Sequence, residues 1–207
     1  MKDINNYIQE KLVINKDSKI YRVKVHSKSE LKILIDETVQ KTKDTENIDL
    51  NFVDISELTD LTRIFKQYKF KKINIESWDV SNIKQMIQMF PYTLEQIDLS
   101  NWDVSHVETM SGMFCNCDNL KEIGDISNWD VSQVKNMANM FENCKSLKKL
   151  DLSKWDAKSL TNCYWMFANC QSLESIGKLQ SNSNLFYQIK REFGNGIFYN
   201  CKKLKRQ

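Results

Sequence analysis

Four cysteines recur along the chain and raise the question of a metal or redox site. Each follows a phenylalanine by three residues: Cys117, Cys144, Cys170 and Cys201. A zinc site usually needs pairs of ligands separated by about two to four residues, often with histidines. These thiols instead recur once per repeat of the sequence, so we interpret them as small core residues stacked along a scaffold. We expect no metal and no other cofactor.

Aspartates also recur, which raises the question of acid–base catalysis. One follows each repeated tryptophan: Asp79, Asp103, Asp130 and Asp156. A residue that every repeat contains serves the repeat, so we interpret these carboxylates as acceptors of backbone hydrogen bonds at turns. The chain has only His26 and His106, with no HExxH sequence, no glycine-rich phosphate loop and no Ser/His/Asp order. The sequence therefore predicts a protein that is not an enzyme.

A second column of mostly acidic residues is a candidate binding surface. It occupies the polar position of short alternating segments: Asp49, Asn74, Asp98, Asp125 and Asp151. That position points away from the core of a strand with one buried face. Asp98, Asp125 and Asp151 are therefore candidate partner-binding residues that would attract a basic patch on another protein. The alternative is an ordinary solvated strand face.

Two large aromatic residues stand where other repeats vary. Tyr164 and Trp165 occupy the positions of Ser111 and Gly112 in an earlier repeat. Exposed tyrosine and tryptophan are common anchors of protein interfaces, so we consider this pair a second candidate binding site. The alternative is that the irregular segment 180–197 covers both rings.

Basic residues gather at two flanks, although the net charge is only +3. Residues 63–72 carry five basic side chains and no acid, and residues 186–207 carry six with one glutamate. Residues 73–185 between them carry 9 basic and 14 acidic side chains. The flanks add further candidate binding residues: Lys69, Lys71, Lys72, Lys202, Lys203 and Arg206. Phosphate binding is one hypothesis for them, and a charged surface that keeps the protein soluble is the other.

A repeat of about 26 residues must position all of these side chains. Its tryptophans are separated by 24, 27 and 26 residues: Trp78, Trp102, Trp129 and Trp155. Residues 97–99 alternate like a strand with one buried face. Val107, Met110, Met113 and Phe114 then fall at i, i+3, i+6 and i+7, which predicts a short helix. Such a unit cannot bury its apolar face alone, so the units must stack on one another.

The pattern LDLSxWDVSxVxxMxxMFxNCxSLxxL, found at residues 97–123 and 123–150, resembles the BspA-like leucine-rich repeat of bacterial surface proteins and protists. This resemblance implies an α/β repeat solenoid, a leucine-rich-repeat-like stack of about six coils with a short strand plus a short helix in each. It also implies adhesion or protein recognition without catalysis.

The resemblance also suggests how the chain is divided. We expect residues 1–47 to form an α+β N-terminal cap, with a strand over 19–25 and a helix within 28–47. The BspA-like repeats follow over residues 48–179. Residues 180–207 are expected to form a degenerate C-terminal capping repeat and a basic tail.

The N-terminus bears on the compartment. The first sixteen residues lack the apolar run of a signal peptide, and no stretch approaches the roughly 18 apolar residues of a membrane helix. If Met1 is the native start, we expect a cytoplasmic protein (in the host cytoplasm if phage-encoded) with no membrane partner.

Our first functional hypothesis is a non-enzymatic protein–protein interaction module that recognises a macromolecular partner through the solenoid surface. One alternative is a phage or mobile-element inhibitor of a host defence nuclease, similar to anti-CRISPR proteins. Another is nucleic-acid binding through the basic flanks, directly or as part of a partner complex.

Overall fold

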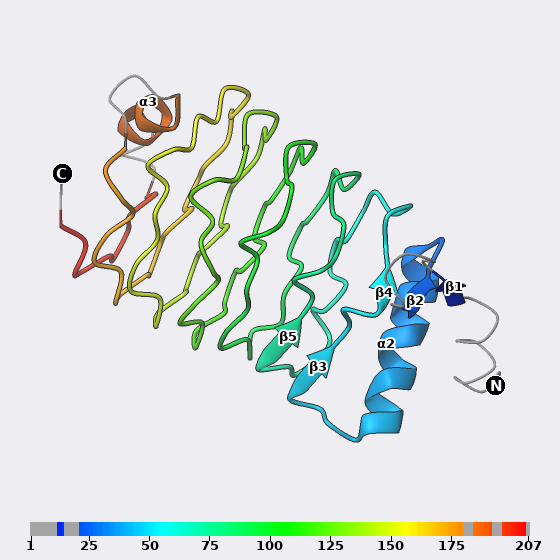
Figure 1. Ribbon diagram of the computed structural model, residues 1–207. Coiled ribbons are helices and arrows are strands. Elements are labelled where there is room, and N and C mark those ends of the chain that lie inside the picture. The colour runs from blue at the N-terminus through cyan, green and yellow to red at the C-terminus, as the bar shows by residue number, and fades with distance from the viewer. Residues whose placement is uncertain (1–11, 15–20, 180–183, 192–195, 206–207) are drawn as a thin grey trace.

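The chain forms a row of coils that lie side by side (Figure 1). The computed structural model describes residues 12–14, 21–179, 184–191 and 196–205, and for residues 12–14 and 21 it describes the backbone alone. The candidate residue Arg206 lies outside these ranges. Among the described residues, no helix is both long enough and apolar enough to cross a membrane.

A small sheet connects the N-terminal part to the first coil. β1 (Leu12–Ile14) pairs antiparallel with β2 (Tyr21–Lys24). β2 also pairs in parallel with β4 (Val53–Asp54) of the first coil. The strand expected within residues 19–25 is therefore confirmed, and its parallel pairing attaches it to the repeats.

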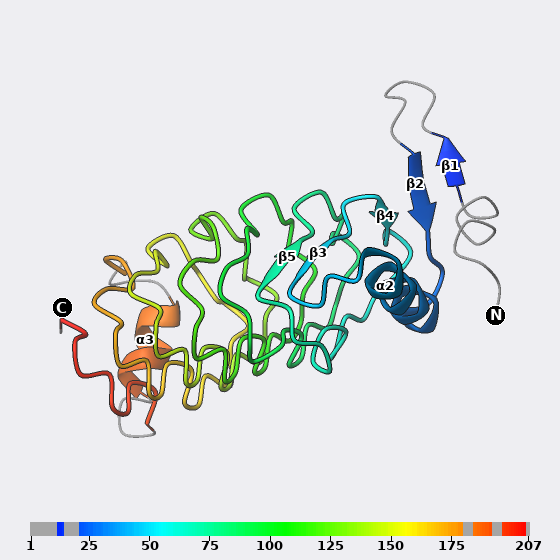
Figure 2. The ribbon, with the colours of Figure 1, turned by 90° about the horizontal axis from the view of Figure 1, so that it is seen from below.

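A helix, α2 (Lys28–Thr42), lies against the same end of the row (Figures 1 and 2). It begins after Ser27, whose hydroxyl accepts a hydrogen bond from the Glu30 N–H at 3.1 Å, as N-cap residues commonly do. Leu31, Leu34 and Ile35 are completely buried and join the hydrophobic core. The helix expected within residues 28–47 is confirmed, and it covers the apolar end of the first coil.

Two ladders of parallel backbone pairing run along the row of coils. The first ladder starts with β3 (Asn47–Asp49) and β5 (Lys72–Asn74), and single bridges extend it from Lys72 to Gln96 and from Gln96 to Glu122. A further bridge joins Lys149 to Ser175. The second ladder consists of single bridges between successive members of one column: Asp60, Gln85, Thr109, Asn136 and Asn162. Each coil therefore has two extended segments bonded to its neighbours, and Figure 2 shows the coils following one another between α2 and α3 (Asn184–Arg191).

The short helix expected in each repeat is not formed at residues 107–114, because this segment belongs to the second ladder. The Met110 N–H donates to the Asn136 carbonyl oxygen of the next coil at 2.9 Å, and the Gly112 N–H donates to the Ala138 carbonyl oxygen at 2.8 Å. A helix would direct these N–H groups to carbonyls four residues earlier in the same coil. Gly112 also has φ +61°, which a right-handed helix does not contain. The chain turns at this glycine, and that turn directs Met110 and Met113 into the core.

Repeated aromatic side chains fill the interior between the two ladders. The phenylalanine rings of successive coils stack nearly parallel, with centroids 4.9 Å apart for Phe90 and Phe114 and 5.4 Å apart for Phe114 and Phe141. The indole of each of the four repeated tryptophans donates to a carbonyl oxygen of the coil before it, as Trp155 does to Ile126 at 2.9 Å. The residues that define the period are therefore the residues that bond one coil to the next.

The repeated cysteines lie in the same interior. The Cys144 thiol donates to the Phe114 carbonyl oxygen at 3.3 Å, and the Cys170 thiol donates to the Phe141 carbonyl oxygen at 3.0 Å. Burial raises the pKa of the Cys144 thiol well above its ordinary value. The interpretation of these cysteines as stacked core residues is confirmed.

The last coil contains the second helix. Leu185 and Ile189 of α3 are buried, and the Phe198 ring stacks on Phe167 with centroids 5.4 Å apart. The phenylalanine column thus continues to the end of the described chain.

Candidate binding surfaces

The aspartates of the first ladder act partly as turn acceptors. Asp98 Oδ1 accepts hydrogen bonds from the Ser100 hydroxyl at 2.6 Å and the Ser100 N–H at 3.0 Å, and these bonds lower the pKa of Asp98 below its usual 3.8. Asp125 and Asp151 each accept from the serine N–H two residues later, both at 2.9 Å. All three side chains are exposed. They stabilise their own turns, and their charged side chains are exposed.

These aspartates do not form the continuous acidic column that we expected. A Cβ on Gly124 would lie 2.2 Å from Asp98 Oδ1, and a Cβ on Gly177 would lie 2.3 Å from Asp151 Oδ1. The coil after Asp98, and the coil after Asp151, therefore presents a glycine to the carboxylate rather than an acid. Gly124 is an extra residue in its repeat and has φ +78°, so it displaces Asp125 along the chain. This bulge interrupts the column between Asp98 and Asp125, whereas Asp125 and Asp151 line the same groove.

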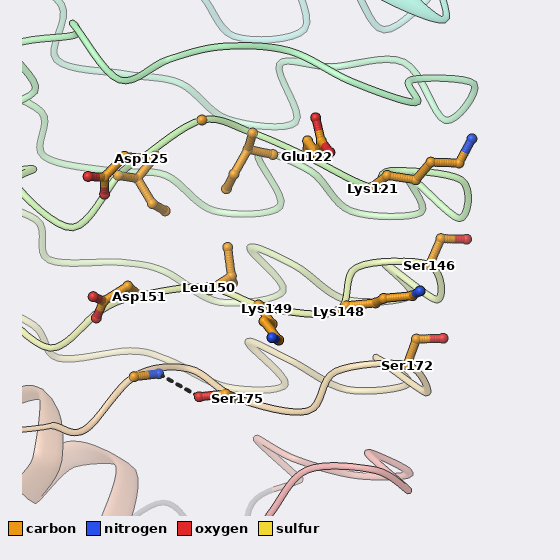
Figure 3. A pocket seen from close by; sticks show the side chains of 14 residues that line it. Lys121, Glu122, Asp125, Ser146, Lys148, Lys149, Leu150, Asp151, Ser172 and Ser175 are labelled. Atoms are coloured by element: carbon orange, nitrogen blue, oxygen red, sulfur yellow. Dashed lines mark hydrogen bonds between the residues drawn. The ribbon is translucent and has the colours of Figure 1, made fainter.

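A groove with a volume of about 1180 Å³ runs along the first ladder, and Gly124 and Gly177 are among the residues that line it. Asp125 and Asp151 lie at one end of it, whereas Lys121 and Lys148 lie at the other (Figure 3). Lys149 lies between these ends (Figure 3). We call this feature the ladder groove. It has one acidic end and one basic end.

A column of alternating charge leads along the coils to the basic end of the groove. Lys71 pairs with Glu46 at 2.7 Å, and Lys121 pairs with Glu95 at 3.0 Å. The bond to Glu46 raises the pKa of Lys71, and the bond to Lys121 lowers the pKa of Glu95. Lys71 was a candidate phosphate-binding residue, but its charge is compensated within the protein. At Lys148 the alternation stops, because a second lysine follows Lys121 in the next coil.

The aromatic pair lies on the second-ladder side of the fifth coil, two and three residues after Asn162. Tyr164 is 47% exposed and Trp165 is 41% exposed, and their rings lie nearly parallel with centroids 6.1 Å apart. A Cβ on Gly196 would lie 2.6 Å from Trp165 Nε1, so the indole lies against the backbone of the next coil. Among the described residues of the segment 180–197, Gly196 lies against the indole of Trp165.

Trp165 also has an unusual backbone. Its φ is +54°, and the equivalent residues Gln88, Gly112 and Asn139 have φ between +47° and +61°. Glycine and asparagine tolerate this left-handed conformation, whereas a bulky residue there is a genuine outlier. The equivalent residue of each of these coils has a positive φ, and in this coil that residue is a tryptophan.

Tyr199 extends the aromatic surface, although the sequence did not lead us to it. It is 65% exposed, and its N–H donates to the carbonyl oxygen of Gly196, the residue on which Trp165 lies, at 2.9 Å. We call Tyr164, Trp165 and Tyr199 the aromatic patch. The signal in the sequence was a tyrosine at the position that Ala168 occupies one coil earlier.

The basic flanks are not brought together. Lys69 and Lys72 are exposed beside β5, near α2, whereas Lys202 and Lys203 are exposed in the last coil at the opposite end of the row (Figure 1). The described residues of the two flanks therefore do not form one phosphate-binding surface.

The described residues contain no group of three or more His, Cys, Asp or Glu side chains that could hold a metal ion. His26 lies 2.6 Å from Glu57, which also pairs with Lys24 at 2.8 Å. The bonds to Lys24 and His26 lower the pKa of Glu57 to about 2. This cluster joins the N-terminal part to the first coil, which gives His26 a structural role.

Comparison with known proteins gives one match. A family model matches the chain twice, over residues 34–122 and 92–206, so that the two matches overlap and together cover well over half of the chain. The family is described as "Mycoplasma protein of unknown function, DUF285". No curated protein and no solved structure matches the chain.

Proposed function

Since the chain belongs to the DUF285 family of mycoplasma proteins, we propose that it is a non-enzymatic protein-interaction module. In this proposal the row of coils is a leucine-rich-repeat-like solenoid of the BspA-like type, and the aromatic patch anchors a protein partner. The proposal is supported by a difference between the repeated and the non-repeated side chains. The repeated Phe, Trp and Cys residues bond or pack one coil against the next, which leaves the exposed, non-repeated residues for recognition.

The observation that carries the proposal is Trp165. A left-handed backbone costs a non-glycine residue about 1–2 kcal/mol. Asn139 and Gly112 reduce that cost in the two preceding coils. Arg63 and Gln88 bear it in the first two coils, where the Arg63 Nε donates to Gln88 Oε1, whereas Trp165 bears it with a large aromatic ring that is 41% exposed. Neither the backbone nor the core explains this residue, and strained residues of this kind tend to occur at functional sites. Stacking on Tyr164 adds a rigid, amphipathic surface of the kind that dominates binding energy at interfaces.

The test is affinity capture from the native host with two variants. Tyr164→Ser combined with Trp165→Asn replaces the pair with the residue types that earlier coils have at Ser111 and Asn139. Tyr92→Ser is the matched control, because Tyr92 is 51% exposed in another coil. We expect the wild type and the control to capture the same partner, and the double variant to bind it at least about 30-fold more weakly, as for a hot spot of about 2 kcal/mol.

The partner's affinity is then measured with each purified variant. Equal affinity for the wild type and the double variant would remove the aromatic patch from consideration. Nuclease treatment of the extract tests the alternative of nucleic-acid binding, since a partner held only through nucleic acid is lost after digestion.

A further inference from the structure

We propose that the aromatic patch binds an acidic polypeptide segment, whose carboxylates pair with Lys202 and Lys203 while an apolar side chain lies on the exposed rings. This inference rests on the protein-binding function proposed above, and it names the chemistry of the partner. It starts from the turn that follows Tyr199.

The two lysines lie at the centre of a tight turn over residues 201–204, which we call the lysine turn. The Leu204 N–H donates to the Cys201 carbonyl oxygen at 3.4 Å and closes the turn. Lys202 and Lys203 are both exposed, and Tyr199 precedes the turn by two residues. Because successive Cα atoms are about 3.8 Å apart, the backbone of Lys202 lies within about 11 Å of that of Tyr199, a span that four residues of an extended partner segment cover.

The backbone that carries Tyr199 and the lysine turn is held to the preceding coil. The Cys201 thiol donates to the Phe167 carbonyl oxygen at 2.9 Å, and the Asn200 amide Nδ2 donates to Asn169 Oδ1 at 2.9 Å. These bonds lie between the tyrosine and the lysines, so they fix the spacing of the aromatic and the basic side chains. A partner does not have to order this backbone, which lowers the entropic cost of binding.

The charge of the lysine turn is not neutralised by the coils before it, which contain the same turn. One column of residues fills its first central position in successive coils: Asp118, Lys145, Gln171 and Lys202. Lys145 pairs with Asp118 at 2.6 Å, whereas Lys202 follows a neutral glutamine. Lys203 follows Ser172 in the second central position. Within the described part of the chain, neither Lys202 nor Lys203 forms an ion pair within 4.0 Å.

The acid that lies closest to the lysine turn in the phase of the repeat already has cations beside it. Glu174 occupies the column between Lys148 and Lys205, and its carbonyl oxygen accepts from the Lys205 N–H at 3.4 Å. Helix α3 supplies no compensating charge, because its eight residues contain no acid and it ends in Lys190 and Arg191. Lys202 and Lys203 are therefore the cations of this end that remain for a partner carboxylate.

The charge distribution favours a polypeptide over a nucleic acid. Residues 73–185 carry 9 basic and 14 acidic side chains, so a polyanion that extends from the lysine turn over the coils is repelled. A polypeptide can place two carboxylates at the turn and an apolar side chain on the rings, and it needs no negative charge elsewhere. Exposed tyrosine and tryptophan rings offer a large apolar surface for such a side chain. The lysines then supply specificity and the rings supply most of the affinity.

The probe is a synthetic peptide, Ser-Leu-Phe-Ser-Glu-Glu-Ser, blocked at both ends. One control peptide has glutamine in place of both glutamates, and a single-stranded oligothymidylate represents nucleic acid. Binding to the full chain is followed through the indole N–H NMR signal of Trp165, which is assigned by its absence from the Trp165→Asn variant. We expect the acidic peptide to shift this signal and to bind about three- to tenfold more tightly than the glutamine control, the range for two exposed ion pairs. High salt should remove most of that difference.

A variant of the lysine turn tests the two cations. Lys202→Gln combined with Lys203→Ser gives the turn the residue types that the preceding coil has there. This lysine variant should bind the acidic peptide about three- to tenfold more weakly and the glutamine control as the wild type does. Lys145→Gln is the matched control, because Lys145 has the same turn position but is paired with Asp118. It should leave both affinities unchanged.

Three results overturn the inference. In the first, the acidic peptide binds the wild type no more tightly than the glutamine control does. In the second, the lysine variant binds the acidic peptide as tightly as the wild type does. In the third, the oligothymidylate binds the wild type more tightly than the acidic peptide and is weakened in the lysine variant, which identifies a nucleic-acid site.

The outcome can be separated from the fate of the proposed function. The affinity of the captured partner is measured for the lysine variant and for the variant with Tyr164→Ser and Trp165→Asn. If the aromatic variant loses the partner while the lysine variant binds it as the wild type does, the charge inference fails and the function proposed for the patch stands. If both variants bind the partner as the wild type does, the proposed function fails as well.

Discussion

Replacement of Gly124 by alanine tests how the bulge on the first ladder is built. Gly124 has φ +78°, and a left-handed backbone costs an alanine about 1–2 kcal/mol. The new Cβ would also lie 2.2 Å from Asp98 Oδ1 and 2.5 Å from Ser100 Oγ, so the Asp98 side chain must rotate away. That rotation breaks the bonds from Ser100 at 2.6 and 3.0 Å, which together contribute about 1–2 kcal/mol. We therefore expect Gly124→Ala to lower the free energy of unfolding by about 2–4 kcal/mol.

Gly112→Ala is the matched control. Gly112 has φ +61°, but the nearest atom to a Cβ there is the flexible Gln88 Cγ at 3.1 Å, so only the backbone term of about 1–2 kcal/mol applies. Urea unfolding followed by tryptophan fluorescence measures both variants, and equal m values exclude a change in the unfolded state.

Asp98→Ala completes a double-mutant cycle with Gly124→Ala. It removes the overlapping carboxylate, so Gly124→Ala should cost about 1–2 kcal/mol less in that background than in the wild type. The reasoning fails if Gly124→Ala costs no more than Gly112→Ala, or if its cost is the same with and without Asp98.

Three further predictions concern the strained tryptophan, the turn carboxylates and the thiols. The free energy of unfolding of Trp165→Asn, measured in urea, should exceed that of Trp165→Leu by about 1 kcal/mol, because asparagine tolerates the left-handed backbone better than leucine does. The reverse order would show that packing decides at this site. Bonds from Ser105 lower the pKa of Asp103 below 3.8, so its stabilising effect is complete above the unfolded pKa near 4 and is lost as pH falls through the folded value. The difference in unfolding free energy between the wild type and Asp103→Asn should therefore shrink below pH 4 and stay constant from pH 5 to 7. Burial raises the pKa of the Cys201 thiol to about 11 and raises the pKa of the Cys144 thiol well above its ordinary value. Because Cys201 is only half-buried and Cys144 is buried, alkylation at pH 8 followed by mass spectrometry should modify Cys201 before Cys144, and both fully only in urea.

The sequence revealed the period of the chain because each coil repeats the residues that bond it to its neighbours. Trp155 illustrates this, since its indole reaches the Ile126 carbonyl oxygen of the preceding coil and every such bond needs a tryptophan in the same phase. The turn role of Asp103 was recognised for the same reason, and its Oδ1 accepts from the Ser105 N–H at 3.0 Å. Periodicity is informative wherever a side chain serves the stack.

The conformation within a coil could not be read from the same periodicity. Met110, Met113 and Phe114 have helical spacing, but an extended residue followed by a turn at a left-handed position directs the same three side chains inward. The distinguishing signal was the residue between the methionines, Gly112 in one coil and Asn139 in another, since both residue types favour positive φ. A hydrophobic pattern reports which side chains are buried and leaves the backbone path between them open.

The candidate sites also differ in whether their residues follow the period of the repeat or depart from it. Asp98, Asp125 and Asp151 were predicted as one acidic column because they share a phase, yet the extra Gly124 breaks that phase between Asp98 and Asp125. Trp165, a bulky residue on a left-handed backbone, also departs from what the coil requires. In a stacked repeat, binding residues are therefore to be sought where the residue type differs from the type that the coil needs at that position. For this chain that criterion selects the aromatic patch, and it gives no reason to select the paired Lys71.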